Sequence, residues 1–290
     1  SQIQLQKLYL KFNNNENANL KVFELLADIL PELINLKVFN FEFLKSFDKD
    51  IDLLLEYLAY GIANMKRLEQ LGLNLRCLFN MTAQGISRLA SAFRFLKALK
   101  SLSLDFSGCK QLTNDFIKAL SEPLEQCPSI KTINLDLDYC KEISDLGLKY
   151  FSKAIPVLNV EYLKLDLTYC DKITDSGIQY LKEGLESCKQ IRFLELDLKC
   201  KALTQKAVSY ILEGIRDKKL LQSVDLALPG EYMTDNSIEN LKGILILLPF
   251  LKNINVKIWG CKKDISKALK SFFDDWDDDV SISLTRIHSA

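Results

Sequence analysis

Four aspartates recur in this sequence in the same local setting, each directly after a leucine and before another apolar residue. Asp105, Asp136, Asp166 and Asp197 are separated by 31, 30 and 31 residues, by subtraction of their numbers. If the segments that carry them lie side by side as strands roughly 4.8 Å apart, the carboxylates form a row of like charges. Exposed neighbours in such a row repel each other by about a few tenths of a kcal/mol, and the row attracts cations. It therefore has the chemistry of a binding surface for a basic segment of a partner protein.

Two explanations for this row stay open. The row can be inherited with a duplicated repeat unit, in which case Lys164 and Lys199 partly neutralise it. Alternatively the row, extended by Asp138, Glu195 and Asp225, forms an acidic belt that steers and holds a basic partner.

Aromatic and basic residues stand just past the row. Tyr139 and Tyr169 occupy matching positions, and tyrosine is enriched where interfaces concentrate binding energy, although both rings can equally pack against neighbouring loops. Arg76 and Trp259 occupy the corresponding rim near opposite ends of the array. The candidate partner-binding residues are therefore Asp105, Asp136, Asp138, Asp166, Asp197, Glu195, Asp225, Tyr139, Tyr169, Arg76 and Trp259.

The sequence lacks the residue arrangements that catalysis or metal binding needs. The single histidine, His288, lies in the terminal tail, no C-x-x-C pair occurs, and no G-x-x-x-x-G-K phosphate loop occurs. We therefore expect no catalytic residue, no metal and no cofactor, and a protein that is not an enzyme. The formal net charge of zero argues against a nucleic-acid partner.

The cysteines form a column of their own. Cys109, Cys140, Cys170 and Cys200 are spaced 31, 30 and 30 residues apart by subtraction, and Cys261 lies 61 beyond Cys200. We expect buried free thiols that donate weakly to loop carbonyls. Such thiols favour a reducing, intracellular and cytoplasmic location.

The elements that carry these columns repeat about every 31 residues. Apolar residues alternate in one part of each unit, as at Leu163, Leu165 and Leu167, which predicts a half-buried strand. The residues that begin the strand pattern are Leu8, Phe39, Leu71, Leu102, Ile133, Leu163, Leu194, Val224 and Ile254. The other part has helical spacing, as at Ile178, Leu181 and Leu185. Hydroxyl residues that we expect to cap these helices recur in register: Thr82, Thr113, Ser144, Thr174, Thr204 and Thr234.

The string Leu163-x-Leu165-x-Leu167-x-x-Cys170-x-x-Ile173-Thr174-Asp175-x-Gly177-Ile178 resembles a leucine-rich repeat with cysteine at the loop position. It is similar both to the cysteine-containing repeats of F-box substrate adaptors and to the ribonuclease-inhibitor type. The resemblance implies an α/β horseshoe solenoid with a parallel concave sheet and convex helices. Residues 1–290 are then a single domain of about nine repeats, one for each strand start given above.

The two ends of the repeat array differ in sequence. A helix is expected over 265–273, followed by a C-terminal cap and tail over 274–290. Within the cap we expect an acidic turn, Trp276 covering the last core layer, and an edge strand over 280–284. Leu5, Leu8, Leu10 and Phe12 open the chain without an evident cap. We expect another chain or upstream sequence to cover that N-terminal edge.

A leucine-rich repeat leaves several functions open. We favour a non-catalytic scaffold whose concave acidic face binds another protein. The alternatives are a structural subunit of a large assembly, such as a ciliary or cytoskeletal one, a GTPase activator of the Ran-activating type, and a substrate adaptor for ubiquitin ligation. The longest apolar run, residues 243–251, is interrupted by Pro249 and is shorter than the roughly 18 residues of a membrane span, so no membrane insertion is expected.

Overall fold

The computed structural model describes residues 5–13, 20–44, 51–231, 233–261, 265–274, 276 and 279–287. Its strands form one sheet of ten in chain order from β1 to β10. The strands are β1 (Lys7–Asn13), β2 (Val38–Leu44), β3 (Gln70–Asn74), β4 (Ser101–Asp105), β5 (Thr132–Asp136), β6 (Tyr162–Asp166), β7 (Phe193–Asp197), β8 (Ser223–Pro229), β9 (Asn253–Trp259) and β10 (Ser281–Ile287).

A helix follows each of the first nine strands. The α-helices are α1 (Leu20–Ile29), α2 (Ile51–Asn64), α3 (Ala83–Ala92), α4 (Asn114–Leu124), α5 (Asp145–Ala154), α6 (Asp175–Ser187), α7 (Gln205–Ile215), α8 (Asp235–Leu245) and α9 (Ser266–Phe272). Short 3-10 turns extend three of them: η1 (Leu30–Glu32), η2 (Phe93–Phe95) and η3 (Ile155–Val157).

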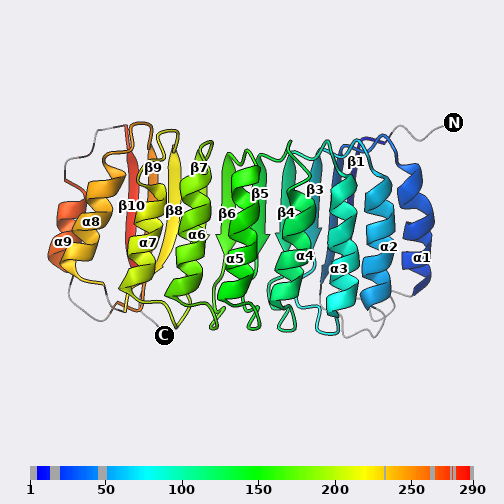
Figure 1. The fold of residues 1–290 in the computed structure, drawn as a ribbon, viewed down its shortest axis with the longest axis horizontal. Coiled ribbons are helices and arrows are strands. Elements are labelled where there is room, and N and C mark those ends of the chain that lie inside the picture. Colours follow the sequence, from blue (N-terminus) through cyan, green and yellow to red (C-terminus); the bar gives the residue numbers. More distant parts are fainter. Residues whose placement is uncertain are drawn as a thin grey trace.

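The elements stack into two layers, with the helices in a row on one side of the sheet (Figure 1). Neighbouring strands pair in parallel, as β5 does with β6 and β6 with β7. This confirms the predicted α/β repeat solenoid. We call the sheet surface opposite the helices the open face.

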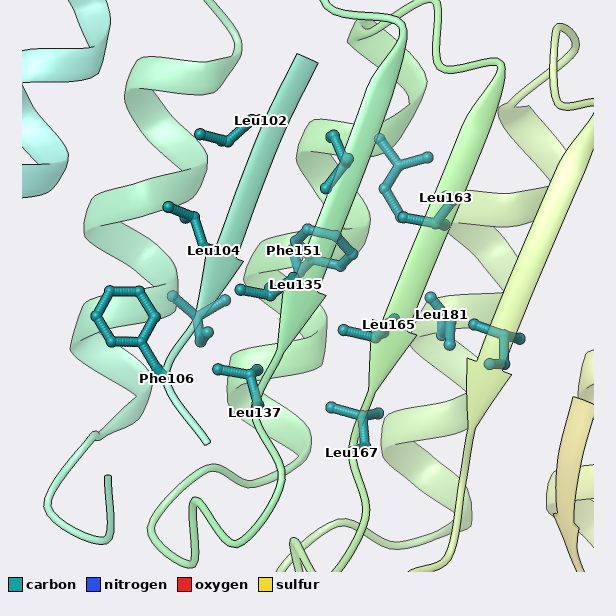
Figure 2. Close-up of a cluster of buried hydrophobic side chains, with 14 of the residues drawn as sticks. Leu102, Leu104, Phe106, Leu135, Leu137, Phe151, Leu163, Leu165, Leu167 and Leu181 are labelled. Atoms are coloured by element: carbon teal, nitrogen blue, oxygen red, sulfur yellow. The ribbon is translucent and has the colours of Figure 1, made fainter. Parts of the chain in front are cut away.

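The core lies between the two layers and follows the predicted alternation. In β6, Leu163 and Leu165 are buried while Tyr162, Lys164 and Asp166 are half-buried. The residues expected to begin the strand pattern pair with one another across the sheet, as Ile133 does with Leu163 and Leu163 with Leu194. Figure 2 shows the repeating strand leucines in rows beside Phe151 of α5 and Leu181 of α6. Each repeat thus buries its apolar side chains against its neighbours, which is the source of stability in such arrays.

The six hydroxyl residues all precede a helix, but not all of them cap it. Thr82, Thr174 and Thr204 accept a hydrogen bond from a backbone N–H of the first turn, and Thr234 forms a capping box with Ser237. The prediction is wrong for Thr113 and Ser144, whose side chains make no cap bond. The Ser144 hydroxyl instead accepts from the Asn114 side chain, at 2.9 Å.

A second set of bonds joins successive repeats at the same point. Asp145 at the start of α5 accepts from both the backbone N–H and the hydroxyl of Thr174 in the next repeat, each at 2.7 Å. We call such a contact an inter-repeat clamp. The clamps are Asp52 with Thr82, Asn114 with Ser144, Asp145 with Thr174, and Asp175 with Thr204. Gly177 leaves room for one of them, because a Cβ there would lie 2.5 Å from Asp145 Oδ1.

The cysteine column confirms the predicted buried thiols. Cys109, Cys140, Cys170 and Cys200 are free and buried, and each Sγ donates to a carbonyl oxygen of the preceding repeat at 3.0–3.3 Å. Burial raises the pKa of the Cys109 and Cys170 thiols to about 12. These thiols therefore stay protonated and fill space inside the turns.

The two ends of the array are finished differently. At the C-terminal end, β10 pairs in parallel with β9, and Trp276 lies 5.9 Å from the Phe272 ring between centroids. The predicted helix over 265–273 is α9, while Asp275, Asp277, Asp278 and His288 lie outside the described residues. At the N-terminal end, Leu25 and Ile29 of α1 are 57% and 48% exposed.

Candidate protein-binding face

The four recurring aspartates lie side by side on the open face. Asp105, Asp136, Asp166 and Asp197 pair in register at the ends of β4, β5, β6 and β7, and Ala227 follows them on β8. The predicted ladder of carboxylates is therefore present. Each side chain also has a structural role that the sequence did not reveal: one carboxylate oxygen accepts the backbone N–H two residues ahead, at 3.0, 3.0, 2.9 and 3.4 Å respectively. These bonds are Asx turns, which shape the loop after each strand.

The acidic residues on β7 and β8 have cationic or hydrogen-bonding partners. Glu195 accepts from Tyr162 at 2.5 Å and lies 3.1 Å from the Lys164 ammonium. Asp225 accepts from the Asn255 amide at 2.7 Å and lies 3.5 Å from the ammonium of Lys257 on β9. Glu195 and Asp225 are thus largely neutralised within the protein, whereas Asp197 on β7 has no ion pair among the described residues.

The carboxylates of Asp136 and Asp138 are in a different position, because no ion pair reaches either within the described residues. Burial, and then the charges of Asp105 and Asp166, raise the pKa of Asp136 to about 6. Burial, followed by Asp166, Asp136 and Asp197, raises the pKa of Asp138 to about 6. One Asp138 oxygen is buried without a hydrogen-bond partner. The field at this point of the open face therefore favours an incoming cation.

Burial also raises the pKa of Asp197. Asp105, at the other end of the row of aspartates, has one cation nearby, because Arg76 Nε lies 3.8 Å from its carboxylate. The predicted rim residue Arg76 therefore joins the belt itself. We define the unpaired half of the open face by Asp105, Asp136, Asp138 and Asp166, where the 3.8 Å approach of Arg76 to Asp105 is the one ion pair among the described residues. The paired half is defined by Glu195 and Asp225.

The predicted aromatic residues gather at one rim. The rings of Tyr139 and Tyr169 lie 4.4 Å apart between centroids. The Lys199 ammonium lies 4.7 Å from the Tyr169 ring centroid and 3.9 Å from that of Trp259. Trp259 is therefore not an isolated residue at the far end of the rim, as its sequence position suggested, but part of this cluster. Lys199 provides the link that sequence analysis missed.

Tyr139 and Tyr169 also share an uncommon backbone conformation. Their φ angles are +59° and +56°, and the equivalent positions in two earlier repeats are Cys77 at +56° and Gly108 at +76°. A non-glycine residue in this region is uncommon and strained. The turn geometry of the repeat is therefore kept even where a bulky tyrosine occupies the position.

A groove of about 490 Å³ crosses the open face from β1 to β6. Its lining contains Asp105 and Asp136 together with residues that sequence analysis did not single out as a site: Tyr9, Asn40, Gly72, Asn74, Ser103 and Asn134. The sequence places these residues at outward positions of their strands. It does not show that their side chains together enclose a groove, because that depends on the relative sizes of side chains on neighbouring strands. The groove contains Asp105 and Asp136 of the unpaired half, and it ends at Lys164, the lysine that pairs with Glu195.

The described residues contain no group of three or more His, Cys, Asp or Glu side chains arranged to hold a metal ion. Within the same part of the chain, no helix combines the length and apolar character needed to cross a bilayer.

Comparison with known proteins adds support for the repeat itself. Residues 162–182 match the family model described as Leucine Rich repeat. No curated protein matches the sequence significantly.

Two solved structures illustrate the similar folds. The crystal structure of the Rad7 and Elc1 complex in yeast is 14% identical with a TM-score of 0.40, over 98% of this chain and 81% of that one. Leiomodin-1 Actin-Binding Site 2 is 13% identical with a TM-score of 0.37, over 70% of this chain and 90% of that one. At these values neither neighbour bears on what this chain binds.

Proposed function

We propose that this protein is a non-catalytic scaffold whose open face binds a basic segment of another protein. The observation that supports the proposal is the unpaired half of the face. Asp136 and Asp138 are partly buried, repel one another and Asp166, and have no ion pair among the described residues. A cation from a partner relieves that repulsion, so binding gains free energy that the isolated protein lacks.

The candidate residues divide between two roles in this proposal. Asp105, Asp136, Asp138 and Asp166 contact the basic segment, with Asp197 extending the field beside them. Tyr139 and Tyr169 supply an aromatic ledge next to the carboxylates, of which Tyr139 is 40% exposed. Glu195, Asp225, Arg76 and Trp259 orient or balance the surface, since each already has a partner within the protein.

Affinity capture tests this function. The wild-type protein and the Asp136→Lys/Asp166→Lys variant are immobilised, and a lysate of the source cells is passed over both at low and at high salt. We expect a protein with a basic segment that binds the wild type, is released by salt, and is not retained by the variant. The matched control is Lys252→Asp/Asp279→Lys, which exchanges the charges of an exposed pair away from the site. If the same proteins bind all three, the acidic face is not the binding surface.

We also propose that the N-terminal edge of the sheet is covered by another chain or by further sequence of the same protein. The exposure of Leu25 and Ile29 on α1 supports this. Leu25→Glu/Ile29→Glu tests it by sedimentation: loss of a self-associated or complexed species supports a covered edge, and unchanged behaviour of an already monomeric chain opposes it.

A reducing intracellular location is part of the same proposal. Four adjacent repeats each bury one free cysteine: Cys109, Cys140, Cys170 and Cys200. In an oxidising compartment such thiols would be oxidised whenever local unfolding exposes them.

A further inference from the structure

The residues in the middle of the groove across β1 to β6 are small. Gly72 on β3 contributes no side chain and Ser103 on β4 a short one, while Tyr9 on β1 and Lys164 on β6 stand on either side along the strand order. Tyr9 is 64% exposed. The hollow therefore has room for a side chain that enters from outside, near the centre of the open face.

The neutral side chains of the groove offer little to an incoming group. The Asn74 and Asn134 side-chain oxygens are buried without a hydrogen-bond partner, and the Asn134 amide nitrogen donates to the Ser103 hydroxyl at 3.1 Å. The cations in the lining are already engaged, since Lys11 lies 2.7 Å from Glu42 and Lys164 lies 3.1 Å from Glu195. The groups of the lining that can receive a cation are therefore the carboxylates of Asp105 and Asp136.

Those two carboxylates stand next to each other. Asp105 and Asp136 are register partners on β4 and β5, which places their strands about 4.8 Å apart. Asp136 has no ion pair among the described residues, and Arg76 Nε approaches Asp105 only to 3.8 Å. One oxygen of Asp105 accepts from the N–H and the hydroxyl of Ser107, at 3.0 and 2.7 Å, and one oxygen of Asp136 accepts from the Asp138 N–H at 3.0 Å. A further cation with several donors can bridge the two remaining oxygens.

We propose that the groove receives one arginine side chain of the partner's basic segment, with the guanidinium bridging Asp105 and Asp136. This inference rests on the proposed function and specifies how the open face selects its partner. Arginine fits better than lysine because its planar group presents donors along two edges, toward both carboxylates at once. Lysine offers a single compact charge that cannot span the two strands equally well.

A small probe tests the proposal without a known partner. N-acetyl-arginine amide is titrated into the ¹⁵N-labelled protein, with N-acetyl-lysine amide as the comparison, and backbone amide shifts are followed. We expect saturable shifts at Gly72, Ser103 and Asn134, and at least threefold weaker binding of the lysine compound. Asp105→Asn/Asp136→Asn is expected to weaken arginine binding at least fivefold, whereas Asp225→Asn leaves it unchanged.

A steric variant separates shape from charge. Gly72→Gln fills the groove at constant charge, and because a Cβ there meets the Asn40 side-chain oxygen at 2.0 Å, only that flexible side chain must move. Ser283→Gln at an exposed position of β10 outside the groove is the matched control. We expect Gly72→Gln to abolish the arginine shifts and the control to preserve them.

The outcomes distinguish the two proposals. Equal binding of the two compounds, or shifts confined to β7–β9, overturns the arginine site. If arginine fails to bind but the captured protein is still lost with Asp136→Lys/Asp166→Lys, the scaffold function stands and this inference fails. If arginine binds in the groove but no salt-sensitive protein is captured, the scaffold function fails instead.

Discussion

The unpaired and paired halves of the open face both present carboxylates, from neighbouring columns of the strand register, yet they differ in charge balance. Glu195 and Asp225 each have a lysine from a neighbouring strand within 3.5 Å. Asp136 and Asp138 have neighbours that are mostly acidic, and their pKa values are raised to about 6 as a result of burial and of those charges. The contrast shows that the function of an acidic column depends on what the adjacent column supplies. Glu195 on β7 pairs with Lys164 of β6 and Asp225 on β8 pairs with Lys257 of β9, whereas Asp136 on β5 has no ion pair among the described residues.

Charge reversal is expected to give the largest difference between the halves. Asp136→Lys/Asp166→Lys should weaken binding of a captured partner about 100-fold, or about 2.7 kcal/mol. Glu195→Lys/Asp225→Lys should weaken it less than about tenfold, because those carboxylates are already neutralised. Isothermal titration with all three proteins measures both effects. Equal losses in the two variants would mean that overall charge, and not the unpaired half, attracts the partner.

The stability of the two halves should respond differently to neutralisation. The folded pKa of Asp136 is about 6, above the roughly 3.9 of an unfolded aspartate. The native state therefore binds more protons between these values, and the free energy of unfolding falls as pH rises from about 4 to 6. Asp136→Asn should raise it by about 1 kcal/mol at pH 7, after allowance for solvent screening, and should not raise it at pH 4. Urea unfolding at the two pH values measures this.

Asp225→Asn is the matched variant of the paired half. It loses the attraction of Lys257, so the free energy of unfolding should stay the same or fall by about 0.5 kcal/mol at pH 7. A stabilisation as large as that of Asp136→Asn would show that the two halves do not differ.

Removing one lysine should turn part of the paired half into an unpaired one. Lys164→Met leaves Glu195 with Tyr162 alone and takes a positive charge away from the edge of the groove. We expect a stability loss of about 0.5 kcal/mol together with severalfold tighter partner binding, because a competing cation is gone. Unfolding curves and titration report the two quantities separately, and a loss of affinity would contradict the idea that Lys164 competes with the partner.

The smallest effect is expected at the aromatic rim. Tyr139→Gly relieves a backbone conformation that glycine adopts readily but removes the ring that lies 4.4 Å from Tyr169. These effects oppose each other, so the midpoint of thermal unfolding should move by no more than about 2 °C. Partner affinity should still fall, because the exposed ring borders the unpaired half. Unchanged affinity would restrict the binding surface to the carboxylates.

The sequence predicted the repeat, the strand register and the cysteine column because these follow directly from spacing. The alternation of Leu163, Leu165 and Leu167 with polar residues gives both the buried face of β6 and the place of Asp166 on its open face. Nothing beyond periodicity is needed for that step.

The balance of charge could not be predicted in the same way. Lys164 is in register with Glu195 but is also close enough to Asp136 and Asp166 to feel their charges, and only its side-chain conformation decides that it pairs with Glu195. The cluster of Lys199 with Trp259 likewise joins residues 60 positions apart by subtraction. The Asx turns of the aspartates had a sequence signal, namely an aspartate at the end of each strand. An aspartate at that position is equally compatible with an exposed binding residue, so the signal does not decide between the two roles.

The inter-repeat clamps have a consequence for how the array comes apart. Three clamps in succession join α4 to α7, through Asn114, Asp145 and Asp175. At the start of α3 and of α7 the clamp position holds Ala83 and Gln205, and the described residues show no clamp from them to Thr113 and Thr234. In addition, α8 packs only lightly against α7. The amide hydrogens in the middle of the solenoid should therefore exchange slowly and together. Under a stretching force, the repeats should separate first at the junction between α7 and α8.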